Sequence, residues 1–213
     1  ETVKKFIALG ATVAVETGAG ETASITDADY AAAGADVVKD AAKGADIVLG
    51  VQGPDPKALK GAKAGAWIVA GLDPFGQRAR IDDYAKGGFE ALAMEFMPRI
   101  TRAQSMDILS SQSNLSGYKA VMEAANLYGR AFPMMMTAAG TIAAAKCFVM
   151  GVGVAGLQAI ATARRLGAQV SATDVRSATK EQIQSLGAKP IFVESVAGIE
   201  AEGAGGYATE MSE

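Results

Sequence analysis

The feature that most constrains this chain is a glycine-rich turn at residues 151–156, which reads Gly-Val-Gly-Val-Ala-Gly. It follows an apolar run at residues 146–150 that predicts a buried strand, and it precedes a helix-like stretch at residues 157–166. A second strand is expected at residues 169–174, where it ends in an aspartate. Strand, glycine turn, helix, strand and acid follow one another in the order that a dinucleotide-binding βαβ unit requires.

Each glycine of the turn has a separate physical role. Gly151 allows the tight turn after the strand, Gly153 lets a pyrophosphate approach the backbone, and Gly156 lets the helix pack against the strand. The helix offers its free N–H groups and the positive end of its dipole to the phosphates. A glycine turn that binds nothing can have the same sequence, but the flanking strand, helix and acid favour the binding interpretation.

The acid at the end of the second strand predicts which dinucleotide binds. Asp174 follows Gly151 by 174 − 151 = 23 residues, close to the separation of about 20 in such sites. Its carboxylate would accept hydrogen bonds from the adenosine ribose and repel a 2′-phosphate, so NAD(H) is favoured over NADP(H). Arg176 is the one feature that argues for NADP(H).

Composition excludes several classes of function. The 213 residues are 50% hydrophobic and carry a net charge of −3 without a basic run, so we expect a buried core and no nucleic-acid partner. The single Cys147 provides no disulfide framework, which is typical of a reducing cytoplasm. Lys146, Pro133 and several glycines interrupt the apolar stretch at residues 132–163, so no transmembrane helix and no signal peptide are predicted.

Strand and helix signals alternate along the chain, which predicts an α/β fold with parallel sheets. We expect two Rossmann-like domains joined by a long helix at residues 113–130, the first at residues 1–109 and the NAD(H)-binding one at residues 110–213. Both are expected to be incomplete, the first without its N-terminal strand and the second without its second half, as in a segment of a longer protein. Further strands, the middle two of them buried, are expected at residues 11–15, 46–50, 66–70 and 89–94.

The chain contains no histidine. Dehydrogenases that act on hydroxy or amino acids usually employ one as a general acid and base, although a lysine or aspartate with a shifted pKa can replace it. Neither a histidine-dependent catalytic triad nor a His/Cys metal site is available, so no metal is predicted. Direct hydride transfer between two nicotinamides moves no proton at the reacting carbons and fits this chain, provided that the second nicotinamide comes from elsewhere.

A polar segment at residues 95–110 follows the last predicted strand of the first domain. Ligands in open α/β folds bind beyond the carboxyl ends of strands, so polar side chains in this segment are placed to reach a bound nucleotide. The candidates are Arg99, Gln104, Asp107 and Ser110. Because Asp107 lies three residues from both Gln104 and Ser110, the three would share a helix face. Spacing alone favours a solvated, capped helix start.

Several long motifs resemble the NAD(H)-binding component of proton-translocating nicotinamide nucleotide transhydrogenase, the alpha subunit in bacteria, within the alanine dehydrogenase/transhydrogenase superfamily. The resemblance covers essentially the whole chain and is carried by residues 97–118, 133–140, 151–163 and 173–176. It implies that this chain binds NAD(H), that a partner component (the beta subunit) binds NADP(H), and that hydride transfer is coupled to proton movement through a membrane-spanning component. It also implies a homodimer that is peripheral on the cytoplasmic face of the membrane.

The resemblance implies roles for individual residues. Arg99, Gln104 and Asp107 match the family's polar loop at the nicotinamide end of NAD(H), where Gln104 helps to juxtapose the two rings, and Ser110 matches a further contact there. The pyrophosphate turn and the ribose acid with its neighbours match Gly151, Gly153, Val154, Gly156, Asp174, Val175 and Arg176. Residues 205–211 resemble the family's mobile loop, with Tyr207 and Met211 as contact residues, although their composition equally fits a disordered tail.

Two alternatives remain open. An alanine dehydrogenase has a related fold and binds the same cofactor, but it predicts a catalytic histidine after a strand near residues 67–71 and a substrate-binding lysine. Residues 69–73 read Val-Ala-Gly-Leu-Asp, without histidine. A non-catalytic nucleotide-sensing module would bind NAD(H) and transfer hydride with no partner.

Overall fold

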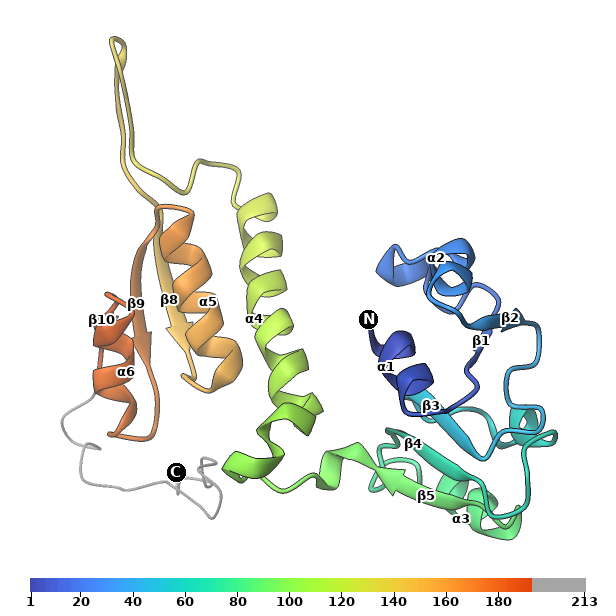
Figure 1. Ribbon diagram of the computed structural model, residues 1–213. Coiled ribbons are helices and arrows are strands. Elements are labelled where there is room, and N and C mark those ends of the chain that lie inside the picture. The colour runs from blue at the N-terminus through green and yellow to red at the C-terminus, as the bar shows by residue number, and fades with distance from the viewer. Residues whose placement is uncertain (193–213) are drawn as a thin grey trace. The chain divides into compact units, whose positions relative to one another are not determined.

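The computed structural model describes residues 1–192 and divides the chain into two compact units, Glu1–Met97 and Pro98–Glu213 (Figure 1). The sequence predicts a boundary between residues 109 and 110, whereas the contacts divide the chain between Met97 and Pro98. The polar segment after Pro98 and the long helix therefore belong to the second unit. The physical reason is that the long helix packs along a later helix of that unit.

The first unit contains two parallel sheets with short helices between the strands. β1 pairs with β2, and β4 lies between β3 and β5. The strands are β1 Ala14–Glu16, β2 Asp36–Val38, β3 Ile47–Gln52, β4 Trp67–Gly71 and β5 Glu90–Ala93. The helices are α1 Thr2–Ala8, α2 Asp27–Ala32 and α3 Arg78–Lys86, with 3₁₀ turns η1 Glu21–Ala23, η2 Pro56–Leu59 and η3 Met94–Phe96. The predicted strands and helices are present, but β2 is absent from the sequence prediction because its three residues carry too short a pattern.

The core of the first unit lies on one face of the β3–β4–β5 sheet. Ile68 and Ala70 of β4 are buried there together with Tyr84 of α3. The apolar run at residues 46–50 predicts a fully buried strand, and this is wrong, because Ile47 and Leu49 of β3 are 52% and 55% exposed. Side chains alternate along a strand, and only one face of this sheet is covered within residues 1–192.

The second unit is a parallel sheet in the order β10–β9–β8, joined by helices as in a βαβ unit. An antiparallel hairpin of β6 and β7 precedes it. The strands are β6 Met135–Thr137, β7 Gly140–Ile142, β8 Lys146–Met150, β9 Gln169–Thr173 and β10 Lys189–Pro190. The helices are η4 Thr101–Met106, α4 Ile108–Leu127, α5 Val154–Arg165 and α6 Thr179–Ser185. Strand, turn, helix and strand follow one another as the glycine motif predicts.

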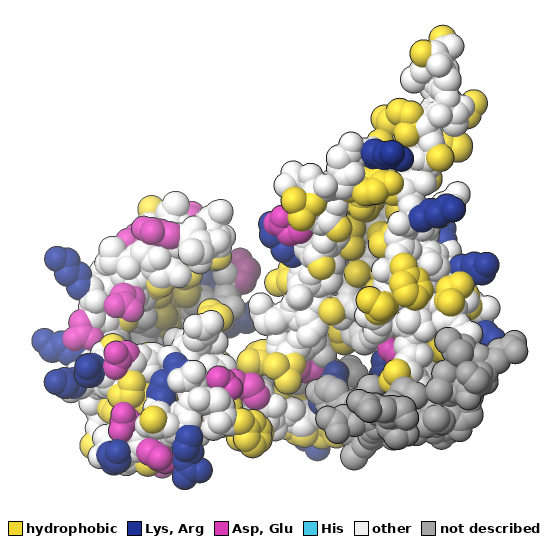
Figure 2. Space-filling view, turned by 180° about the vertical axis from the view of Figure 1, so that it is seen from behind, with side chains coloured by type: hydrophobic (Ala, Val, Ile, Leu, Met, Phe, Trp, Pro, Cys, Tyr) yellow, Lys and Arg dark blue, Asp and Glu magenta, His cyan; other side chains and the backbone are white. Residues whose placement is uncertain are grey.

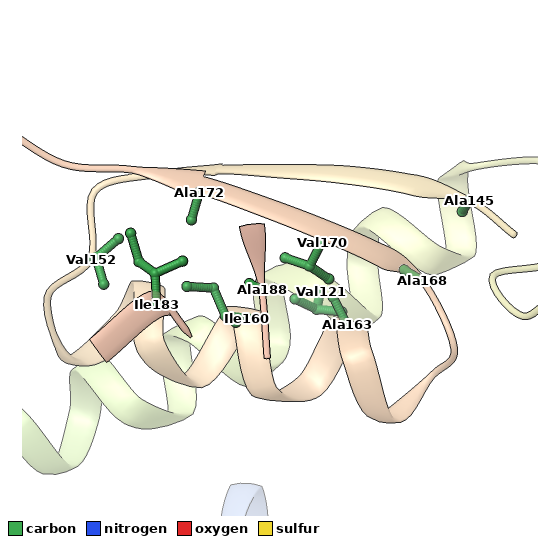
Figure 3. Packing of buried hydrophobic residues seen from close by; sticks show 10 residues of the cluster. All are labelled: Val121, Ala145, Val152, Ile160, Ala163, Ala168, Val170, Ala172, Ile183 and Ala188. Carbon is green, nitrogen blue, oxygen red and sulfur yellow. The ribbon is translucent and has the colours of Figure 1, made fainter. Parts of the chain in front are cut away.

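The core of the second unit lies between the sheet and its helices. Figure 3 shows Val170 and Ala172 of β9 facing Ile160 of α5, with Ile183 of α6 and Val121 of α4 completing the cluster. The alternating residues of β9 are therefore the ones that hold the helices. This packing fixes where the helices begin, and with them the glycine turn and the start of α4.

The hairpin extends away from the rest of the second unit (Figure 1). Figure 2 shows hydrophobic side chains along it, and Met135, Met136 and Ile142 are 45%, 74% and 50% exposed. The sequence prediction misses this hairpin, because its strands have only three residues each. Within residues 1–192, no helix has the length and apolar composition needed to cross a bilayer.

Candidate functional site

The glycine turn has the backbone geometry that its sequence predicts. Gly151 follows β8 with φ of +91°, a conformation that side chains disfavour. A Cβ atom on Gly156 would lie 1.9 Å from the carbonyl oxygen of Gly151, so only glycine lets α5 start this close to the strand. Between them, the buried side chain of Val152 joins the hydrophobic core and anchors the turn (Figure 3).

The start of α5 has the form of a phosphate cradle. A Cβ atom on Gly153 would meet nothing within 4 Å, so no contact within the described chain requires glycine here. No side-chain hydrogen bond caps the helix, which begins at Val154. Its first-turn N–H groups and positive dipole end therefore face an open approach, which fits the backbone contact of a dinucleotide pyrophosphate.

Asp174 lies directly beyond the end of β9 and beside the turn. Its carboxylate accepts the N–H of Val152 at 2.6 Å, and thereby ties the end of β9 to the glycine turn. It also accepts bonds from the backbone and the side chain of Arg176, two residues further on. Burial by itself raises the pKa of Asp174, but these hydrogen bonds and the Arg176 charge hold the pKa below its ordinary value. Val175, between them, is 42% exposed.

The polar segment forms a pocket of about 410 Å³ in the second unit. It is lined by the four predicted residues Arg99, Gln104, Asp107 and Ser110. The glycine turn does not contribute to its lining. A single polar pocket therefore gathers side chains that the sequence spreads over the segment around the start of α4.

The shared helix face predicted for Gln104, Asp107 and Ser110 is wrong. Gln104 belongs to η4, whereas Asp107 is the N-cap of α4 and Ser110 lies in its first turn. Asp107 has extended backbone angles (φ −77°, ψ 92°), and this break between the two helices turns Gln104 out of the α4 register. The capped helix start that spacing favours is confirmed, and the same carboxylate also lines the pocket.

Asp107 organises the pocket electrostatically. Its Oδ1 accepts the N–H of Ser110 at 3.0 Å, and its Oδ2 accepts the Ser110 hydroxyl at 2.7 Å. Arg99 Nε lies 3.9 Å from the Asp107 Oδ2. The two bonds from Ser110 are the main cause that holds the pKa of Asp107 below its ordinary value, and the Arg99 charge acts in the same direction. The pocket therefore holds an ionised carboxylate and a guanidinium near neutral pH.

Helix α4 joins the polar pocket to the glycine turn. A Cβ atom on Gly117 would lie 2.0 Å from the carbonyl oxygen of Ala155 in the first turn of α5. The two helices start at the same end of the unit (Figure 1). From Gly117 back to Ile108 is about 14 Å of helix, so the pocket lies beyond the start of α5. Sequence reasoning misses Gly117, because one glycine within a helical pattern carries no signal of its partner.

Two predicted contact residues, Tyr207 and Met211, lie outside the described residues. Within residues 1–192, no group of three or more His, Cys, Asp or Glu side chains is arranged to hold a metal ion.

Comparison with known proteins places this chain among nucleotide-dependent enzymes. Residues 1–116 match the family model for the N-terminal domain of alanine dehydrogenase/PNT, and residues 120–205 match the model for its C-terminal domain. The chain is 56% identical over 223 residues to an NAD(P) transhydrogenase subunit alpha of Rhodospirillum rubrum, the first of the chains into which that subunit is divided. That alignment covers 100% of this chain and 58% of the relative, so the chain spans little more than half of that protein.

Solved structures agree with the sequence comparison. The transhydrogenase from Sinorhizobium meliloti matches with a TM-score of 0.87 and 59% identity, over 90% of this chain and 58% of that one. An L-alanine dehydrogenase matches with a TM-score of 0.77 over 91% of this chain and 55% of that one, and at 24% identity this likeness shows the fold alone. With both domain models matched in order along the sequence, this chain belongs to the alanine dehydrogenase/PNT family.

Proposed function

We propose that this chain is the NAD(H)-binding portion of a transhydrogenase that passes hydride from NADH to NADP⁺ on a partner component. The observation that carries the proposal is the polar pocket of Arg99, Gln104, Asp107 and Ser110, at the end of the second unit where α5 and its glycine turn begin. A dinucleotide whose pyrophosphate rests on α5 needs such a polar site for its nicotinamide end. The relatives named as transhydrogenase subunit alpha give independent support.

In this proposal the chain holds the two ends of NAD(H) differently. The first-turn N–H groups of α5 bind the pyrophosphate, with Gly153 leaving room for it, and Asp174 accepts the adenosine ribose hydroxyls. The residues of the polar pocket bind the nicotinamide end. The nicotinamide supplies the hydride that is transferred.

The work left to the protein side chains is orientation and the exclusion of water. No histidine is present to act as a general acid or base, and hydride transfer between two nicotinamides requires none. The ionised Asp107, held by Ser110 and close to Arg99, gives the pocket fixed donors and acceptors. Gln104 is the residue that we assign to aligning the two rings, because productive transfer needs reacting atoms about 3–3.5 Å apart.

The proposal extends to partners. The second nicotinamide is bound by an NADP(H)-binding component, and a membrane-spanning component couples the reaction to proton movement. The relatives are named as divided alpha subunits, which supports a multi-subunit assembly. This chain would lie on the cytoplasmic face of the membrane, without inserting into it. We further propose a homodimer, and the exposed apolar side chains of the β6–β7 hairpin offer a surface that a second copy would bury.

One experiment separates this function from its alternatives. The full-length protein is mixed with NADH, an NADP⁺ analogue and the purified NADP(H)-binding component, and reduction of the analogue is followed. Analogue reduction that depends on both proteins supports the proposal. Tight NADH binding without transfer to any acceptor would instead identify a nucleotide-sensing module. Alanine-dependent reduction of NAD⁺ would identify an alanine dehydrogenase, the alternative that the family model keeps open and the lack of histidine disfavours.

A further inference from the structure

The carboxylate of Asp174 has no accepting capacity left in this structure. Its Oδ1 accepts the backbone N–H and the Nε of Arg176, each at 2.9 Å. Its Oδ2 accepts the N–H of Val152 at 2.6 Å and the Nη2 of Arg176 at 3.1 Å. A carboxylate has about four lone-pair positions, and these four bonds use them all. Ribose hydroxyls that reach Asp174 must therefore displace a donor that is already present.

The four donors differ in their freedom to move. The N–H groups of Val152 and Arg176 belong to backbone held in place by the pairing of β8 with β9. The guanidinium of Arg176 stands at the end of a side chain with several rotatable bonds. The guanidinium is therefore the donor that ribose hydroxyls displace, while the two backbone bonds keep the carboxylate in position.

The pair is also shielded from water. The side chains of Asp174 and Arg176 are only 5% and 18% exposed, so solvent screens their attraction much less than in a surface pair. The guanidinium binds through two of its nitrogens, one to each carboxylate oxygen. This forked arrangement is the one by which arginine also binds phosphate groups.

We propose that Arg176 is a second specificity-determining residue of the nucleotide site, and that Asp174 rejects a 2′-phosphate partly by holding the Arg176 guanidinium. This proposal rests on the NAD(H)-binding function proposed above. An arginine near this position is what accommodates the 2′-phosphate in NADP(H) sites of this fold. Here the carboxylate neutralises that arginine and engages its donors, so a 2′-phosphate meets a negative charge and no available cation.

This mechanism differs from simple repulsion in one measurable way. If Asp174 acts by repulsion alone, removing its charge improves NADPH binding whether or not Arg176 is present. If Asp174 also sequesters Arg176, the improvement requires the arginine. A double-mutant cycle on these two residues therefore tests the proposal directly.

The test is calorimetric titration of NADH and NADPH into the full-length protein and its variants. Asp174→Asn keeps the shape of the side chain, and Asp174→Ser avoids an amide that would face the N–H of Val152. We expect both to raise the affinity for NADPH at least about tenfold, as a charge-assisted hydrogen bond to phosphate predicts. Asp174→Asn with Arg176→Gln should lack this gain. Asp174→Asn with Arg165→Gln, an equal charge change at the exposed end of α5, should keep it.

Two further measurements use the same proteins. Added NaCl should weaken NADPH binding more steeply in Asp174→Asn than in the double variant with Arg176→Gln, because only the former has the cationic contact. Arg176→Gln alone should bind NADH at least as tightly as the parent protein, since it lacks the donor that ribose displaces. A tenfold loss of NADH affinity in that variant would overturn the proposal.

The remaining outcomes are also decisive. An equal NADPH gain with and without Arg176 would show repulsion alone and overturn the proposal, as would no gain in a folded Asp174→Ser variant. Failure of the parent protein to bind NADH would contradict the proposed function itself, and is recognised before any variant is compared.

Discussion

A Cβ atom on Gly117 of α4 would lie 2.0 Å from the carbonyl oxygen of Ala155 in α5, so the two helices approach backbone to backbone at this point. Ala155 follows the first residue of α5, immediately after the glycine turn. Gly117 is also one of two buried residues of α4, the other being Val121. The distance between the polar pocket and the glycine turn is therefore set by a contact that only a glycine permits.

Replacing this glycine should separate the helices. We expect Gly117→Ala to lower the free energy of unfolding by about 1–3 kcal/mol, the usual effect of an overpacked contact, despite the better helix propensity of alanine. Urea unfolding measures this change, and the exposed neighbour Ser116→Ala is the control. NADH affinity should also fall in Gly117→Ala, because the two ends of the cofactor site move apart. Unfolding curves that match those of the control would contradict this account of the contact.

Gly153 and Gly156 should respond to alanine in opposite ways. A Cβ atom on Gly153 meets nothing within 4 Å, whereas one on Gly156 would lie 1.9 Å from the carbonyl oxygen of Gly151. We expect Gly153→Ala to leave thermal unfolding unchanged and to weaken NADH binding, because its methyl group takes the place of the pyrophosphate. Gly156→Ala should lower the melting temperature even without nucleotide. Unchanged NADH affinity in Gly153→Ala would show that no phosphate approaches this residue.

Gln104 should affect the transfer step more than binding. Gln104→Asn withdraws the amide by one methylene, and a misplacement of about 1 Å reduces the rate of an oriented reaction by on the order of 100-fold. We expect the single-turnover hydride-transfer rate to fall far more than the NADH affinity. Gln112→Asn, on the exposed face of α4 outside the pocket, is the matched control. Equal losses in rate and affinity would mean that Gln104 only binds.

Asp174 should contribute to the acid sensitivity of the fold. Burial alone would raise its pKa in the folded protein, but the bonds from the Arg176 side chain and from backbone N–H groups outweigh burial and lower the pKa. A carboxylate with a lowered folded pKa contributes stability that is fully present above its unfolded pKa of about 3.9 and is lost as the pH falls through the folded value. The free energy of unfolding should therefore drop less steeply below about pH 4 in Asp174→Asn. Urea unfolding at a series of pH values measures this, and parallel profiles for the two proteins would refute it.

The hairpin surface predicts how the proposed homodimer responds to charge. Met136 is 74% exposed on β6, and Met136→Glu would place a charge in the apolar interface that a second copy forms. We expect the dimer dissociation constant to rise at least about tenfold in sedimentation equilibrium. Val51→Glu, at an 89% exposed apolar position of the first unit, is the control. A dimer as tight as the parent's in Met136→Glu would exclude the hairpin from the interface.

Much of the second unit is predictable from the sequence, because its signals are local. β8, α5 and β9 lie where the apolar runs and glycines place them, and Thr26 caps α2 as predicted. The short strands β2, β6 and β7 escape prediction, since three residues show no clear alternation. The sequence also does not show which face of a strand is covered. That is why Leu49 of β3 is exposed although its run is apolar.

The candidate site divides in the same way. The sequence by itself determined the glycine turn and the acid at Asp174, because both rest on residue type and on the order of adjacent elements. Only the tertiary structure decided that Arg99, Gln104, Asp107 and Ser110 line one pocket, that Gly117 meets Ala155, and that Asp174 is held by Arg176 and Val152. These relationships depend on how helices pack and which rotamers remain open, and a local sequence pattern contains neither.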